Sequence, residues 1–326
     1  MISGHVLLLS EPSTLQLFEE IEAALKLRVA GVTHFRHASD LDVKSEPWRS
    51  SDVFLTYGGF PCTRDLLASS PRLRAIACPW TGTEGFDEAA ATQLGIVVAN
   101  GHAEENTFSV AEATVLFMLA ALYDLHGAEK VLRENRRRPQ LPIAHMLYGK
   151  RIGLVGFGGI GSRVAHLLAP WGGEIVAYDR AAITDPHVQA VDLATLLSTS
   201  DVISLHVGLS HETYHLLNHE NLKLVKRGAI LVNTARGGVI DETALYEAAR
   251  DGRFARIALD VFDKEPLSPT SPLRDLPNAI LTPHMIAQTV EARAAFIPLA
   301  VENVTRLLEG ELPEAEYFRN PEVAAR

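Results

Sequence analysis

The sequence predicts an α/β protein with two doubly wound parallel-sheet lobes. Short apolar runs of strand length alternate with amphipathic stretches of helical length along most of the 326 residues. A glycine-rich motif of the dinucleotide-binding type, GFGGIG, begins only at Gly156, so a separate α/β segment precedes it. Alternating strands and helices form parallel sheets with helices on both faces, and a chain of this length suits two domains.

The first lobe is predicted from the alternation before residue 100. Its expected strands are 5–10, 52–57, 73–79 and 96–100, and its expected helices are 13–25, 63–69 and 86–94. We therefore expect this lobe to end near Asn100-Gly101. A single long helix at 109–133 is expected to follow it.

The second lobe begins with a predicted strand, glycine turn, helix and strand at 151–179. In the turn, Gly156 allows a tight bend, Gly158 lets the backbone approach a pyrophosphate, and Gly161 lets the helix pack close to the strand. The helix turns its free N–H groups toward the phosphates, so its first residues, Gly159 and Ile160, are also cofactor-binding candidates. The strand before the turn and the helix after it make this motif more specific than a glycine pattern alone.

Asp179 ends the second strand of this unit, where a carboxylate can accept hydrogen bonds from the ribose hydroxyls of NAD. Its charge would repel a 2′-phosphate, so NAD is favoured over NADP. Arg180 keeps the alternative open, because an arginine can accommodate that phosphate. A solvated acid that merely ends a strand is the other interpretation of Asp179.

The remaining elements continue the alternation. The expected strands are 201–207, 229–235, 256–262 and 279–283, and the expected helices are 193–198, 218–225 and 241–250. His206 and Thr234, near the ends of two of these strands, are predicted to line the cofactor. The last amphipathic helix, 289–309, has no strand to pair with in the second lobe, which suggests that it returns to pack on the first.

Three residues that can do chemistry follow consecutive predicted strands. They are Arg236, Glu265 and His284, and ligands of open α/β sheets sit beyond the carboxyl ends of the strands. An arginine matches a carboxylate with its planar fork, a histidine can carry a proton near neutral pH, and an adjacent carboxylate favours the imidazolium. Taken singly, each has a plain alternative: a surface turn residue, a solvated acid and a structural histidine.

Composition excludes several classes of protein. A net charge of −10 and a pI of about 5.7 give no electrostatic case for binding nucleic acid or an anionic membrane. The apolar segment 113–123 is expected to be too short to span a bilayer. Cys62 and Cys78 form neither a disulfide framework nor a metal-ligand pattern, so we expect free thiols in a reducing cytoplasm and no metal site.

Over residues 50–310 the chain resembles the D-isomer-specific 2-hydroxyacid dehydrogenase family. The similar motifs are GKRIGLVGFGGIG, KRGAILVNTARGGVIDETAL, ALDVFDKEP and ILTPH, together with SPRLRAIACPWTGTEGFDEAAATQLGIVVAN and SVAEATVLFMLAAL in the first lobe. The resemblance implies a Rossmann domain at 101–289 inserted into a flavodoxin-like substrate domain made of 1–100 and 290–326. It also implies a homodimer formed through the helix that begins near Ser109.

The resemblance further implies roles for individual residues. Arg236 would bind the carboxylate and carbonyl oxygen of the substrate, His284 would be the acid/base, and Glu265 would hold His284 protonated. Asp260 would contact the nicotinamide carboxamide. The loop Thr81-Gly82-Thr83 would hold the substrate carboxylate with its backbone N–H groups.

Some positions depart from the family pattern. Gly208 replaces a proline, and Met285-Ile286-Ala287-Gln288 replaces a small, glycine-containing segment. The segment 56–60 lacks the arginine of the phosphoglycerate branch, and Glu265 stands where the formate branch has glutamine. The leading hypothesis is an NAD-dependent dehydrogenase of a small, unphosphorylated 2-hydroxy or 2-keto acid, similar to glyoxylate and hydroxypyruvate reductases. The alternative is a corepressor-like protein that binds NAD(H) on the same fold.

Overall fold

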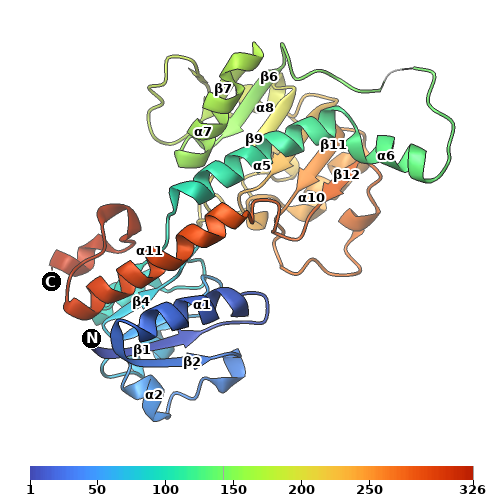
Figure 1. Ribbon diagram of the computed structural model, residues 1–326. Helices are drawn as coiled ribbons and strands as arrows, with labels where there is room; N and C mark the ends of the chain where they lie inside the picture. Colours follow the sequence, from blue (N-terminus) through green and yellow to red (C-terminus); the bar gives the residue numbers. More distant parts are fainter. Residues whose placement is uncertain (142, 326) are drawn as a thin grey trace. The chain divides into compact units, whose positions relative to one another are not determined.

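The computed structural model describes residues 1–141 and 143–325. It divides into two compact units, one made of Met1–Asn106 with Thr289–Arg326 and the other of Thr107–Gln288. We call them unit 1 and unit 2 and describe each by itself (Figure 1).

Unit 1 contains a five-stranded sheet in the order β2-β1-β3-β4-β5. Its strands are β1 (Ile2–Leu9), β2 (Val29–Phe35), β3 (Val53–Thr56), β4 (Ala75–Ala77) and β5 (Val97–Ala99). Its helices are α1 (Leu15–Lys26), α2 (Glu46–Arg49), α3 (Arg64–Ala68), α4 (Glu88–Leu94) and α11 (Val290–Glu309). All strand pairs are parallel, and this order is the flavodoxin-like one.

Helices cover both faces of the unit 1 sheet. Side chains of α1 and α11 pack on one face, against Val6 and Leu55 among others. Side chains of α2, α3 and α4 pack on the other face with Leu7 and Phe54. The last helix of the chain therefore packs on the sheet formed by the first hundred residues, as its lack of a partner strand suggests.

Unit 2 contains a seven-stranded parallel sheet in the order β12-β11-β10-β9-β6-β7-β8. The strands are β6 (Arg151–Val155), β7 (Glu174–Tyr178), β8 (Gln189–Ala190), β9 (Val202–Leu205), β10 (Ala229–Asn233), β11 (Phe254–Leu259) and β12 (Ala279–Leu281). The helices are α5 (Glu104–Leu122), α6 (Leu125–Arg133), α7 (Gly159–Leu168), α8 (Leu193–Thr199), α9 (His219–Leu222) and α10 (Glu242–Arg250). The order reverses between β6 and β9, as in doubly wound dinucleotide-binding folds.

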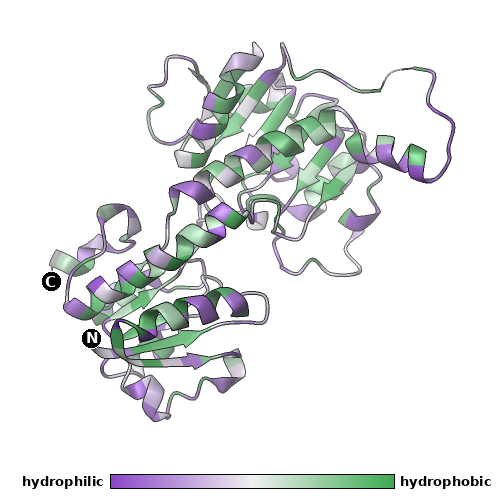
Figure 2. Ribbon diagram, in the orientation of Figure 1, coloured by the Kyte–Doolittle hydropathy of each residue, from purple (hydrophilic) through white to green (hydrophobic). Residues whose placement is uncertain are grey.

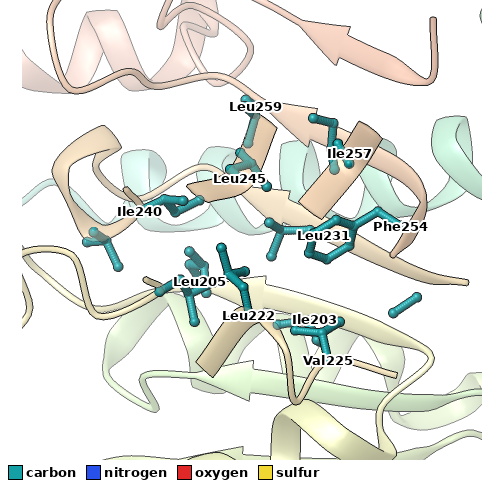
Figure 3. Close-up of a cluster of buried hydrophobic side chains, with 14 of the residues drawn as sticks. Ile203, Leu205, Leu222, Val225, Leu231, Ile240, Leu245, Phe254, Ile257 and Leu259 are labelled. Atoms are coloured by element: carbon teal, nitrogen blue, oxygen red, sulfur yellow. The ribbon is translucent and has the colours of Figure 1, made fainter. Parts of the chain in front are cut away.

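The inner strands of the unit 2 sheet are buried on both faces, which explains why they are mostly apolar (Figure 2). Helices α5 and α7 pack on one face. Helices α8, α9 and α10 pack on the other, where Leu222 and Leu245 meet Ile203, Leu231 and Ile257 (Figure 3). The two doubly wound parallel sheets confirm the predicted fold class.

Several predicted elements are corrected by the structure. The single helix expected at 109–133 is two helices, because the chain bends at Asp124, which adopts a positive φ of 48° and caps α6 through Gly127 N. Arg256 of β11 binds the Asp124 carboxylate at 2.7 Å and fixes the bend. The strands β2 and β8, at the sheet edges, and the short helix α2 were not predicted.

Helix α5 is long and apolar enough, by length and composition alone, to cross a membrane. The expectation concerned the shorter apolar segment 113–123, whereas the helix as a whole has 19 residues. Half of its apolar window is nevertheless buried inside the structure, and Phe117 and Met118 pack in the core with Leu154 of β6. These contacts are those of a core helix in a globular domain.

Candidate active site

The glycine turn between β6 and α7 has the geometry that a dinucleotide needs. Gly156 has a φ of 101°, and a Cβ there would lie 2.7 Å from the carbonyl carbon of His206. A Cβ on Gly161 would lie 2.3 Å from the Gly156 oxygen, so α7 packs directly on the turn. A Cβ on Gly158 would meet nothing within 4 Å, which leaves open space at the start of α7.

The N-terminus of α7 is free to bind an anion. Its N-cap residue, Gly158, has no side chain to accept from the first N–H groups, and Gly159 and Ile160 form the first turn. Backbone N–H groups and the helix dipole at such an end favour a phosphate. The turn and helix therefore fit the pyrophosphate of a dinucleotide.

Asp179 follows β7 and is tied to the glycine turn. One carboxylate oxygen accepts from Phe157 N at 2.7 Å, and the other accepts from Ala181 N at 2.8 Å. These bonds hold the Asp179 carboxylate against the backbone of the glycine turn and of its own loop. Arg180 points to solvent and pairs with Glu212 at 3.7 Å.

Two further cofactor candidates follow β9 and β10. The His206 backbone N–H donates to Val155 O beside the glycine turn, and its ring Nε2 is buried without a hydrogen-bond partner among the described residues. Burial lowers the pKa of His206 to about 4, so the ring is neutral near pH 7. Thr234 is buried and shares a 2.8 Å hydrogen bond with Thr114 of α5.

Arg236 sits in a tight turn after β10. Asn233 holds this turn, because its side chain donates to Arg236 O at 2.9 Å and accepts from Ala235 N at 3.0 Å. A Cβ on Gly237 would lie 1.8 Å from the carbonyl carbon of Phe262, so only glycine lets the two strand ends approach this closely. The turn of Arg236 is thereby placed beside the segment that carries Glu265.

Glu265 and His284 form a hydrogen-bonded pair. His284 Nδ1 lies 2.7 Å from a carboxylate oxygen of Glu265, whose other oxygen accepts from Phe262 N at 3.0 Å. The side chains are 50% and 35% exposed. His284 Nε2 has no hydrogen-bond partner among the described residues, and it is the nitrogen left for a ligand.

This pair shifts both pKa values toward the charged forms. The hydrogen bond to Glu265 raises the pKa of His284 above its ordinary value, against the opposing effects of burial and of the Arg236 charge. Burial alone would raise the pKa of Glu265, but the hydrogen bond and charge of His284 outweigh it and hold the pKa below its usual range. The pair therefore favours the imidazolium of His284 and the carboxylate of Glu265 over their neutral forms.

Asp260 is buried at the end of β11 and organises the segment around His284. One of its carboxylate oxygens accepts from Thr282 Oγ1 at 2.5 Å, from Met285 N at 3.0 Å and from Ile286 N at 3.2 Å. Its carbonyl oxygen accepts from His284 N at 2.7 Å. Asp260 thus binds the backbone of the segment that carries His284.

The loop Thr81-Gly82-Thr83 lies in unit 1, after β4. The buried Asn100 donates from its side chain to Thr81 O at 2.8 Å, and Thr83 donates to Glu88 at 3.0 Å. The three backbone N–H groups of the loop donate to none of the described residues. Consecutive free N–H groups are a site type that binds anions such as carboxylates.

Some residues of this site were not predicted from the sequence. Asn233 clamps the Arg236 turn, and Glu242 of α10 accepts from Asp263 N at 2.9 Å, two residues before Glu265. The asparagine in NTARGG was the available signal for the first, whereas only the folded chain brings Glu242 to its partner. Among residues 1–141 and 143–325, no group of three or more His, Cys, Asp or Glu side chains could hold a metal ion.

All unit 2 candidates lie at the carboxyl edge of one sheet. The glycine turn follows β6, Asp179 follows β7 and His206 follows β9. Thr234 and Arg236 follow β10, Asp260 and Glu265 follow β11, and His284 follows β12. The residues fit a dinucleotide, because open space, uncapped N–H groups and an acid occur together at the point where the strand order reverses. Fold and site together define a Rossmann-type, dinucleotide-dependent oxidoreductase.

Comparisons with known proteins agree with this class. Residues 115–286 match the family model described as "D-isomer specific 2-hydroxyacid dehydrogenase, NAD binding domain". A glyoxylate reductase of Thermofilum pendens is 39% identical over 276 residues, which cover 82% of this chain and 81% of the relative. A hydroxypyruvate reductase of Thermotoga maritima is 40% identical over 247 residues, covering 74% and 80%.

A solved structure is similar over nearly the whole chain. The D-lactate dehydrogenase of Aquifex aeolicus, complexed with NAD and lactic acid, has a TM-score of 0.85 and 28% identity and covers 96% of this chain and 98% of its own. The chain belongs to the D-isomer-specific 2-hydroxyacid dehydrogenase family. It is an NAD-dependent enzyme of that family, and NAD is its cofactor.

Proposed function

We propose that the protein reduces a small, unphosphorylated 2-keto acid to the 2-hydroxy acid, or catalyses the reverse, with His284 as the acid/base. The observation that carries this proposal is the 2.7 Å hydrogen bond between His284 and Glu265, on strand ends next to that of Arg236. Reduction of a 2-keto acid requires a cation that binds the carboxylate and an acid that gives a proton to the carbonyl oxygen. A carboxylate beside this acid keeps it protonated.

Each residue has a distinct part in the proposed reaction. The Arg236 guanidinium binds the substrate carboxylate and polarises the carbonyl. NADH held by the glycine turn would supply the hydride that the substrate C2 accepts. His284 gives a proton from Nε2 to the carbonyl oxygen, and Glu265 holds the Nδ1 proton so that the ring is charged before the reaction.

Besides Arg236 and His284, the proposal assigns binding roles to residues of each unit. Unit 2 binds NAD through the glycine turn with Gly159 and Ile160, through Asp179, and through His206, Thr234 and Asp260. Unit 1 supplies the loop Thr81-Gly82-Thr83, whose free N–H groups would bind the substrate carboxylate. The carboxylate of Asp179 favours NAD over NADP, because it would repel a 2′-phosphate, although the neighbouring Arg180 opposes that repulsion in part.

We further propose that the enzyme is a cytoplasmic homodimer. Helix α6 contains no buried residue, and it exposes Leu125 and Leu132, 60% and 83% exposed. Isolated short helices are marginal in water, so a second copy packed there would stabilise it. The two cysteines are free and buried, which suits a reducing compartment. Sedimentation at several protein concentrations tests the dimer.

A panel of 2-keto acids assayed with NADH and NADPH tests the function. The panel includes glyoxylate, hydroxypyruvate, pyruvate and a phosphorylated analogue of hydroxypyruvate. We expect turnover of one or more unphosphorylated acids with NADH, and weak or no turnover of the phosphorylated one. No turnover of any acid, together with tight NADH binding, would instead favour the NAD(H)-binding corepressor, an alternative that the comparisons do not support.

A preference for NADPH would contradict the role given to Asp179. Replacing Arg236 by glutamine tests substrate binding, because glutamine stays polar but loses the charge and the guanidinium fork. We expect KM for the keto acid to rise and kcat to fall, because a bidentate arginine–carboxylate pair contributes roughly twice an ordinary hydrogen bond. The affinity for NADH should stay within about twofold.

A further inference from the structure

The segment after β12 that carries His284 is an irregular turn without glycine. His284 itself has a φ of 51°, a left-handed conformation that residues other than glycine rarely adopt. Such a conformation persists only where surrounding contacts fix it. The contacts of residues 284–288 therefore decide where the His284 ring points.

Most backbone polar groups of this turn are hydrogen-bonded. His284 N donates to Asp260 O, and the N–H groups of Met285 and Ile286 donate to the Asp260 carboxylate. Gln288 N donates to Met285 O at 3.0 Å. The carbonyls of His284 and Ala287 need other donors, because the Asp260 carboxylate has only acceptors.

Two side chains bind these remaining carbonyls. Gln288 Nε2 donates to His284 O at 2.8 Å, and Ser109 Oγ, from the first turns of α5, donates to Ala287 O at 2.7 Å. Ser109 is buried, and a serine in a helix ordinarily returns its hydroxyl to a carbonyl of its own helix, as Ser198 does in α8. The Ser109 hydroxyl leaves its helix to hold the turn instead.

We propose that Gln288 and Ser109 are positioning residues that hold His284 in its left-handed conformation and so keep its ring on Glu265. The proposal rests on the acid/base role proposed for His284. The effect of Gln288 and Ser109 on the reaction passes through the backbone of the turn.

The expected consequence is a weaker hydrogen bond between His284 and Glu265 when either donor is lost. The charged groups that face His284 are Glu265 and Asp260, which favour its proton, and Arg236, which opposes it. If the turn relaxes, the ring moves from Glu265 while Arg236 remains nearby. The imidazolium then loses its main stabilising partner, and the pKa of His284 falls.

The test uses Gln288→Met and Ser109→Ala in the full chain. Methionine keeps the length of glutamine without a donor, and alanine removes only the hydroxyl. The matched controls are Gln189→Met on β8 and Ser198→Ala on α8, whose side chains lie away from the turn. Ser109→Thr keeps a hydroxyl and is expected to restore the wild-type behaviour.

Two readouts are measured on each variant. NMR titration of the His284 ring in the protein without substrate reports its pKa directly, with His284→Gln used for assignment. Steady-state kinetics over a range of pH report kcat and KM. In both test variants we expect a lower pKa of His284 and a kcat reduced roughly three- to tenfold above neutral pH, the size of one hydrogen bond, with KM and NADH affinity unchanged.

An unchanged pKa of His284 and an unchanged kcat in both variants would overturn the positioning role, and so would equal losses in the control variants. These outcomes differ from failure of the proposed function. If His284 were not the acid/base, the NMR titration would still respond to Gln288→Met, but kcat would not follow the titration.

Discussion

Two histidine–glutamate pairs of nearly the same geometry occur in the two units, and they have different surroundings. In unit 1, His34 Nδ1 lies 2.8 Å from Glu22, and in unit 2, His284 Nδ1 lies 2.7 Å from Glu265. The His34 side chain is fully buried, and its other ring nitrogen is bound to Ser10 Oγ at 2.9 Å. The His284 side chain is half exposed, and its other ring nitrogen has no partner among the described residues.

The comparison shows what makes such a pair suitable for chemistry. His34 is the last residue but one of β2, and Ser10 follows β1, so this pair also lies at the carboxyl end of parallel strands. A position at the end of a strand therefore does not by itself make a histidine–glutamate pair suitable for acid/base chemistry. A proton carrier needs one ring nitrogen held by a carboxylate, the other open to a ligand, and a positive group beside it to bind the substrate. Only the pair in unit 2 has all three.

The largest expected difference between the pairs is in turnover. His284→Ala removes the proposed proton donor, and general acid catalysis contributes about 10²- to 10⁴-fold, so kcat should fall by that order. His34→Ala should leave kcat within about threefold in protein that remains folded. Steady-state kinetics with NADH, together with NADH binding by fluorescence, measure both. Full activity of His284→Ala would remove the proton role.

Replacing the two glutamates should also have different effects on kcat, with a loss for Glu265 and little change for Glu22. Glu265→Gln keeps the shape but removes the charge that holds His284 protonated, so the pKa of His284 falls. Above that pKa, keto-acid reduction should drop by about tenfold for each unit of the shift, because the rate follows the protonated fraction. Glu22→Gln is the matched control. The pH profile of kcat distinguishes them, and identical profiles for Glu265→Gln and wild type would contradict the assignment.

The local features of this site could be predicted from the sequence. Gly156, Gly158 and Gly161 are recognisable because their spacing, the strand before them and the helix after them are all contiguous. Arg236 and His284 were found because each follows an apolar strand directly. Such signals need only neighbouring residues, and the structure places them at one sheet edge.

Features that depend on distant partners could not be predicted. Strand β2 is an edge strand whose residues are only partly buried, so it has no apolar alternation to read. The break between α5 and α6 depends on Arg256, far along the chain from Asp124. The Ser109 hydroxyl is likewise separated from Ala287 by 178 positions. In each case the partner, and not the local sequence, decides the structure.

The pair in unit 1 should matter for stability instead. His34→Ala leaves the buried Ser10 hydroxyl and the Glu22 carboxylate without this partner, at a cost of about 1–3 kcal/mol in the free energy of unfolding. His284→Ala changes a half-exposed side chain and should cost less than about 1 kcal/mol. Urea denaturation followed by circular dichroism measures both. A larger loss in His284→Ala would reverse the comparison.

The smallest effect is the pH dependence of stability that the pair in unit 2 contributes. The raised pKa of His284 gives stability that is fully present below its ordinary value, about 6.5, and is lost as pH rises through the raised pKa. The lowered pKa of Glu265 gives stability that is present above its ordinary range and is lost as pH falls through the lowered pKa. The contribution therefore peaks in the mildly acidic range between them. Because the side chains of His284 and Glu265 are 50% and 35% exposed, solvent screens the pair, and its contribution should stay below about 1 kcal/mol.

Denaturation of wild type and Glu265→Gln at pH 5, 6, 7, 8 and 9 measures this contribution as the difference between their free energies of unfolding. This difference should shrink toward pH 9. A difference that grows steadily with pH would show that Glu265 stabilises the fold without His284.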